Sequence, residues 1–100
     1  MSEHATISTD ILARYAADAA REVDGVRGLV ESHLPLRRGV RISDDNGRIT
    51  VELRVALDWG APIPAVGREV QQHVAEYLQR LADVRPATID VVVDEIGPPS

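Results

Sequence analysis

A chain of 100 residues can build one domain around a single hydrophobic core. It contains no cysteine, which excludes disulfides, thiolate metal sites and a cysteine nucleophile. Its formal net charge of −5 argues against a general nucleic-acid binder, because phosphate contacts need clustered basic side chains. There is no signal-peptide pattern and no apolar run of the ~20 residues that a membrane span needs, so we expect a cytoplasmic protein without direct membrane insertion.

Residues 9–24 are predicted to form the first helix. Apolar side chains recur along it at spacings of three and four, which is the period of a helix with one buried face. Ser8 or Thr9 can cap its amino end, and Gly25 is predicted to close it as a left-handed residue.

Two short strands and a tight turn are predicted next. Residues 26–34 form a weaker strand that Gly28 interrupts, and residues 40–43 form a second one after the loop 35–39. The Asp-Asp-Asn-Gly sequence of residues 44–47 predicts a hairpin turn, since Asn and Gly tolerate positive φ.

The most regular pattern in the chain runs from Ile49 to Trp59. Every odd position in it is apolar, whereas the even positions are mostly polar, and this alternation is typical of a half-buried strand. We therefore expect the odd residues to face a core and the even residues to face solvent or a partner. Trp59 is predicted to be a core anchor against the second helix, with a partner hot spot as the alternative.

A second helix and a last strand complete the chain. Pro64 is predicted to be the first helical residue, because a residue that precedes proline disfavours helical geometry. An apolar stripe at helical spacing follows: Val66, Val70, Val74, Tyr77, Leu78 and Leu81. Residues 87–94 alternate again, with Ile89, Val91 and Val93 directed inward. A strand, a helical crossover and another strand predict parallel pairing.

The resulting order is α-β-β-β-α-β. It predicts an α+β two-layer sandwich, in which a mostly antiparallel four-stranded sheet carries two helices on one face. The sheet would consist of a three-stranded meander and one parallel strand. Residues 7–96 are expected to make this single domain, with residues 1–6 as a flexible N-terminus and residues 97–100 as a tail.

The sequence contains no pattern typical of a catalytic, cofactor or metal site. His4, His33 and His73 do not converge with other ligands at metal-binding spacing, and the acidic residues fit turns and solvated strand faces. A nucleophile elbow and a Gly-rich phosphate loop are both absent. We therefore predict no catalytic residue, no cofactor and no metal.

The predicted partner-binding surface is the outward face of the sheet. It comprises Thr50, Glu52, Arg54, Ala56 and Val92, of which Ala56 and Val92 form a small apolar patch. Arg37 and Arg38 form the one basic cluster of the sequence. One interpretation is that they bind a phosphate or a carboxylate of a partner, and the other is that they belong to an ordinary solvated loop.

Two alternatives of a different kind stay open. One is a small-molecule- or anion-binding domain, or a small enzyme, with a pocket near Trp59 and the start of the second helix, where helix dipoles favour anions. The other is nucleic-acid binding through Arg37 and Arg38, which the acidic charge disfavours.

Several segments resemble the alkaline shock protein family, the Gls-type bacterial envelope stress response proteins. The opening motif is Ile11-Leu12, Ala16, Ala19-Ala20 and Glu22-Val23-Asp24-Gly25-Val26. Four further segments follow in the family's order: Gly39-Val40, the alternating strand that ends in Trp59-Gly60, the helix with Ile63, Val66, Val70-Gln71 and Val74, and the strand with Ile89, Val91 and Val93. The resemblance spans about residues 7–96, and Trp59 stands where the family more often has tyrosine.

The resemblance implies a non-enzymatic protein-interaction domain in the cell-envelope stress response and homeostasis. It implies self-association into a homo-oligomer and recruitment to the inner face of the cell membrane, as a peripheral protein, by small membrane-anchor partners or paralogues. It supplies no catalytic residue, which agrees with the search of the sequence.

Overall fold

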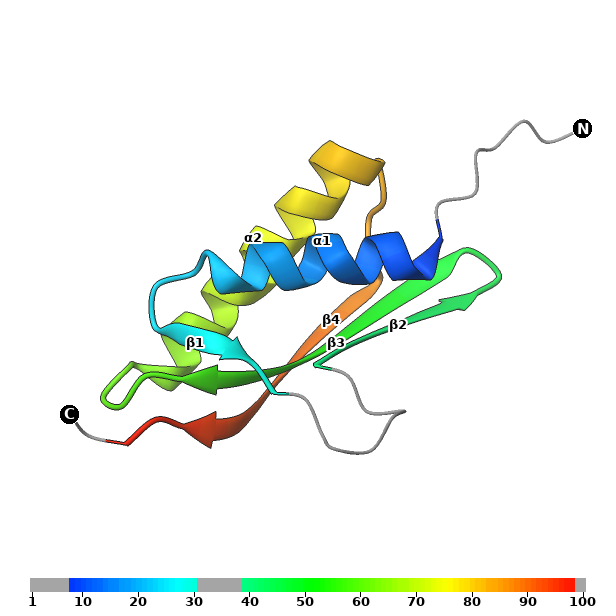
Figure 1. Cartoon of the computed structure of the whole chain (residues 1–100). Helices are drawn as coiled ribbons and strands as arrows, with labels where there is room; N and C mark the ends of the chain where they lie inside the picture. The colour runs from blue at the N-terminus through cyan, green and yellow to red at the C-terminus, as the bar shows by residue number, and fades with distance from the viewer. Residues whose placement is uncertain (1–7, 31–38, 99–100) are drawn as a thin grey trace, which may run out of the picture.

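The computed structural model describes residues 8–30 and 39–98 (Figure 1). Its elements are α1 (Thr9–Arg21), β1 (Val26–Leu29), β2 (Val40–Asp45), β3 (Arg48–Leu57), α2 (Ile63–Ala82) and β4 (Thr88–Ile96). The predicted order α-β-β-β-α-β is confirmed. The predicted flexible N-terminus, residues 31–34 of the first strand, most of the loop 35–39 and the last two residues of the tail lie outside the described residues.

The sheet is organised around β3, which pairs with all three other strands. β1 runs antiparallel to the carboxyl-terminal end of β3, where Leu29 is opposite Val55. β2 runs antiparallel to the amino-terminal part of β3, where Val40 is opposite Leu53. β4 runs parallel to β3 as predicted, from Thr50 onward. Because β4 takes one edge of β3 along this whole length, β1 and β2 lie end to end along the other edge. The predicted meander is therefore wrong in one respect: β1 pairs with β3 and not with β2.

The β2–β3 hairpin turns at the predicted Asn-Gly pair. Asn46 has φ 56° and Gly47 has φ 88°, the two positive values that a tight hairpin turn of this kind requires. The Asp44 carboxylate accepts a hydrogen bond of 2.9 Å from the backbone N–H of Gly47. This geometry lets β2 continue to Asp45, two residues beyond the predicted end.

Both helices lie on the same side of the sheet, as predicted (Figure 1). Their apolar faces meet the odd residues of β3, which are buried from Ile49 to Leu57. α1 adds Leu12 and three alanines, whose small side chains let this helix approach closely, and α2 adds Val66, Val70, Val74 and Leu78. Leu81 was predicted to belong to this stripe, but it is 47% exposed, whereas Leu78 and Ala82 pack against the core.

The helix ends differ from the predictions by one to three residues. Ser8 caps α1 as predicted, since its hydroxyl accepts a hydrogen bond of 3.2 Å from the backbone N–H of Ile11. The helix ends at Arg21 rather than Asp24, and Gly25 is left-handed (φ 97°) but lies in the connection beyond the helix. α2 begins at Ile63, one residue before the predicted start, which is within the usual uncertainty of helix boundaries.

Candidate interaction surfaces

Both helices lie on one side of the sheet, so no helix of the described residues covers its outward face. The structure brings the five predicted residues Thr50, Glu52, Arg54, Ala56 and Val92 together on this face, and each of them is half-buried. Arg54 and Val92 are register partners on the neighbouring strands β3 and β4. The five residues therefore share one face of the sheet, and their role in partner binding stays a prediction.

Two ion pairs lie on this face, and the exposed carboxylate of Asp90, the register partner of Glu52, lies on the same face. The Arg54 guanidinium lies 2.9 Å from the Asp94 carboxylate, and both side chains are about one-third exposed. The Arg41 guanidinium lies 4.0 Å from the Glu52 carboxylate. Such surface pairs contribute at most about 1 kcal/mol to stability.

Arg27 is a residue of this face that the sequence did not reveal. It is the extra residue of a bulge between β1 and β3. Its side chain lies against Gly97, so that any side chain at position 97 would collide with it. β1 and Gly97 lie on opposite sides of β3, and the helices occupy the inner face, so Arg27 must cross β3 over the outward face. Only knowledge of the strand order could have placed it there.

The predicted basic pair Arg37 and Arg38 lies outside the described residues, as do His4 and His33. His73 is described, and it contacts the end of α1: its Nε2 lies 2.8 Å from the Glu22 carboxylate.

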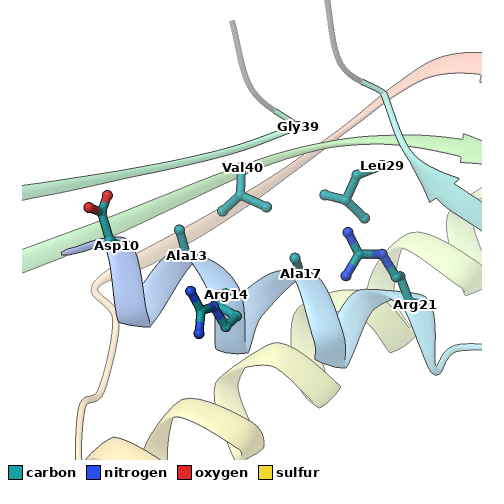
Figure 2. Close-up of a pocket in the computed structure, with 8 residues that line it drawn as sticks. All are labelled: Asp10, Ala13, Arg14, Ala17, Arg21, Leu29, Gly39 and Val40. Atoms are coloured by element: carbon teal, nitrogen blue, oxygen red, sulfur yellow. The ribbon is translucent and has the colours of Figure 1, made fainter. Parts of the chain in front are cut away.

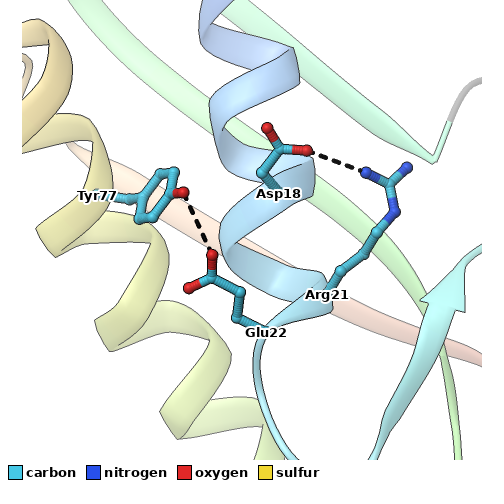
Figure 3. A network of polar contacts seen from close by, with 4 residues as sticks. All are labelled: Asp18, Arg21, Glu22 and Tyr77. Carbon is cyan, nitrogen blue, oxygen red and sulfur yellow. Dashed lines mark hydrogen bonds and ion pairs between the residues drawn. The ribbon is translucent and has the colours of Figure 1, made fainter.

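A polar cluster joins the end of α1 to α2 (Figure 3). The Tyr77 hydroxyl donates a hydrogen bond of 3.3 Å to Glu22, and Arg21 pairs with Asp18 at 3.2 Å. The hydrogen bond with His73, assisted by that from Tyr77, holds the pKa of Glu22 below its usual value despite some desolvation. Desolvation and the Glu22 charge raise the pKa of Tyr77. Every described polar group of this cluster already has a structural partner, so we interpret it as a tie between the helices.

A groove lies between α1 and the point where β1 ends and β2 begins (Figure 2). Its volume is about 300 Å³, and Ala13, Ala17, Leu29 and Val40 line it together with Arg14 and Arg21. The two chain segments that border it are in close contact, since a Cβ at Gly39 would lie 2.6 Å from that of Leu29. The groove combines residues of three elements, which is why no sequence motif indicated it.

Trp59 does not have the predicted core position: it is 63% exposed. The strand alternation that would have directed it inward stops at Leu57, because a turn follows in which the backbone N–H of Ala61 donates to the carbonyl of Asp58 at 3.1 Å. Gly60, with φ 85°, then turns the chain toward α2. A cavity of about 430 Å³ does lie beside Trp59 and the start of α2, where the alternative prediction placed one.

Within residues 8–30 and 39–98, no three His, Asp or Glu side chains come together in a way that could hold a metal ion. None of the helices in this part of the chain is both long and apolar enough to cross a membrane.

These observations define a small α+β domain in which both described helices cover the same side of the sheet. A family model matches residues 1–98, and the chain belongs to that family, the alkaline shock protein 23 family, which is described by a cell envelope-related function. The family resemblance of the sequence motifs is thereby confirmed. No curated protein matches the chain.

Solved structures of the MamM CTD share the fold. One variant superimposes with a TM-score of 0.68 at 18% identity, covering 92% of this chain and 100% of that chain. The manganese form of another variant has a TM-score of 0.66 at 18% identity, covering 88% and 99%. A zinc form has a TM-score of 0.67 at 17% identity, covering 91% and 88%. At such identities the likeness concerns the fold alone, and the metals are properties of those proteins.

Proposed function

We propose that this chain is a non-enzymatic protein-interaction domain of the bacterial cell-envelope stress response, and that the outward sheet face is its contact surface. The observation that carries the proposal is the one-sided cover of the sheet, which leaves Thr50, Glu52, Arg54, Ala56 and Val92 as a continuous half-buried patch. The family's cell envelope-related description supports the setting.

The proposed partners are further copies of this chain and small membrane-anchor proteins or paralogues. Two sheets packed face to face lie about 10 Å apart, which suits the short side chains of Ala56 and Val92. Arg54, the register partner of Val92, would enter that contact already paired with Asp94, which lowers the cost of burying its charge. Anchoring through a partner would hold the chain peripherally at the cytoplasmic face of the membrane. Arg37 and Arg38 are proposed to add contacts to acidic groups of the partner.

Absence of catalysis is part of this proposal. The close polar contacts of the described residues are ion pairs and helix ties, such as Arg54–Asp94 and Glu22–His73, rather than a nucleophile oriented by a base. A pocket for anions near Trp59 is disfavoured, since the charged residues that line it are all acidic: Asp24, Asp58 and Glu69.

The test places a charge in the centre of the outward face. Val92→Asp should shift the light-scattering mass of the purified chain toward the monomer and, in a producing bacterium, move the chain from the membrane fraction to the supernatant. Leu81→Asp is the matched control, because Leu81 is an exposed aliphatic side chain on α2, on the other side of the sheet. The double variant Arg54→Glu with Ala56→Asp should act like Val92→Asp.

Circular dichroism must show that each variant is folded. Wild-type mass and wild-type membrane recovery in both Val92→Asp and the double variant would refute the outward face as the contact surface.

A further inference from the structure

We propose that the corner where β3 leads into α2 binds a basic segment of a partner protein in which arginine or lysine alternates with large aliphatic residues. This Trp59 corner consists of Trp59, Ile63 and Ile96 together with the carboxylates Asp24, Asp58 and Glu69. The inference rests on the proposed interaction role, but it concerns a surface other than the outward sheet face.

The apolar part of the corner is unusually exposed. Five large apolar side chains of the described chain are exposed, and three of them belong to this end of the molecule: Trp59 at 63%, Ile96 at 47% and Ile63 at 40%. Ile96 is the register partner of Leu57, two residues before Trp59, and Ile63 is the first residue of α2. The three side chains lie at the same end of the domain, and of the three only Trp59 lines the cavity. Exposed apolar side chains mark contact sites, and tryptophan is enriched among binding hot spots.

The charged part of the corner is wholly acidic. The cavity beside Trp59 is lined by Asp24 from the connection after α1, Asp58 from the end of β3 and Glu69 from α2, with no basic residue in its wall. None of these three carboxylates forms an ion pair or a side-chain hydrogen bond with another residue in ranges 8–30 and 39–98, in contrast to Glu22 and Asp94. The basic side chain of Arg27 lies against Gly97, next to Ile96, but it does not line the cavity. The acidic wall of the cavity attracts cations and repels anions.

A basic peptide segment fits this combination better than a metal ion does. The carboxylates come from three elements, and in the described part of the chain no three acidic or histidine groups could hold one ion. The rest of the cavity wall is largely apolar and includes Ala61, Pro62 and Ala65. A guanidinium or ammonium group can pair with the carboxylates and stack on the indole of Trp59 by a cation–π contact, while a neighbouring aliphatic side chain covers the apolar wall.

Trp59 is the only tryptophan of the chain, so its fluorescence reports on this corner alone. The probe is a capped peptide of alternating arginine and leucine, and its counterpart is a peptide of alternating glutamate and leucine. The arginine peptide should shift the Trp59 emission to the blue and protect it from acrylamide quenching, whereas the glutamate peptide should do neither. Without peptide, caesium should quench Trp59 more strongly than iodide does, relative to free tryptophan.

The double variant Asp58→Asn with Glu69→Gln keeps Trp59 as the reporter and should weaken arginine-peptide binding roughly fivefold or more. The control, Asp10→Asn with Asp45→Asn, removes the same charge at the opposite end, beside the β2–β3 hairpin (Figure 1), and should change the affinity by less than about twofold. Far-UV circular dichroism verifies folding.

The inference fails if the arginine peptide leaves Trp59 emission unchanged, if the glutamate peptide binds equally well, or if the Asp58–Glu69 variant binds as the wild type does. Val92→Asp separates the two proposals, because it should abolish association while leaving peptide binding intact. Association that depends on Val92, without any peptide binding, would reject the Trp59 corner alone. Peptide binding with association indifferent to Val92 would reject the outward face alone.

Discussion

Replacing Trp59 with alanine should cost little stability, whereas Leu53→Ala should be severely destabilising. Leu53 is fully buried and is opposite Val40 of β2 and Val91 of β4. Its truncation removes three carbon atoms at about 0.8 kcal/mol each and leaves a cavity between the sheet and the helices, for a total of about 3–4 kcal/mol.

Trp59 keeps 63% of its exposure, so only about a third of its surface is covered. For a side chain of roughly 250 Å² this is about 90 Å², which at about 25 cal/mol per Å² gives about 2 kcal/mol as an upper limit. A core tryptophan would cost about 3–5 kcal/mol.

Urea unfolding followed by far-UV circular dichroism measures both losses, because Trp59→Ala removes the fluorescent reporter. The midpoint should fall strongly for Leu53→Ala and slightly for Trp59→Ala, with the slope m unchanged. A loss in Trp59→Ala as large as that in Leu53→Ala would show that the ring belongs to the core, and it would remove the exposed indole on which the Trp59 corner depends.

Three further predictions concern local geometry and pH. Gly25→Val should lower the melting temperature by at least about 4 °C, because position 25 has φ 97° and a Cβ there would lie 3.1 Å from a valine methyl of α2. Gly28→Val is the control and should lower the melting temperature less, because nothing lies within 4 Å of a Cβ at that position. Equal losses in the two variants would contradict this reasoning. Asn46→Ala should cost about 1 kcal/mol in urea unfolding, because its φ of 56° disfavours alanine, and an unchanged midpoint would exclude that strain. The His73 hydrogen bond lowers the pKa of Glu22 from its usual value of 4.5. Glu22 therefore contributes stability above pH 4.5, and this contribution is lost as the pH falls through the folded-state pKa. The urea midpoint of Glu22→Gln should lack this decline at acidic pH, and a pH profile equal to that of the wild type would refute the assignment.

The central strand, the hairpin and the helix cap were predictable from the sequence because each depends on neighbouring residues. Alternation along β3 predicted the burial of Val51, Leu53, Val55 and Leu57, since successive side chains of a strand point to opposite faces. The Asn-Gly turn and the Ser8 cap follow from backbone preferences of the residues themselves. The outward position of Arg54 follows from the same alternation.

The strand order, the crossing of Arg27 and the exposure of Trp59 depend on residues far apart in the chain, and only the tertiary structure decided them. β1 and β2 share one edge of β3 because β4 occupies the other, which no local pattern encodes. The alternation that predicted a buried Trp59 stops at Leu57, because residues 58–61 form the turn that leads into α2, and the place of α2 on the sheet is a tertiary feature. Periodicity reports the local backbone conformation, but the point at which a strand ends is set by what the rest of the chain packs against it.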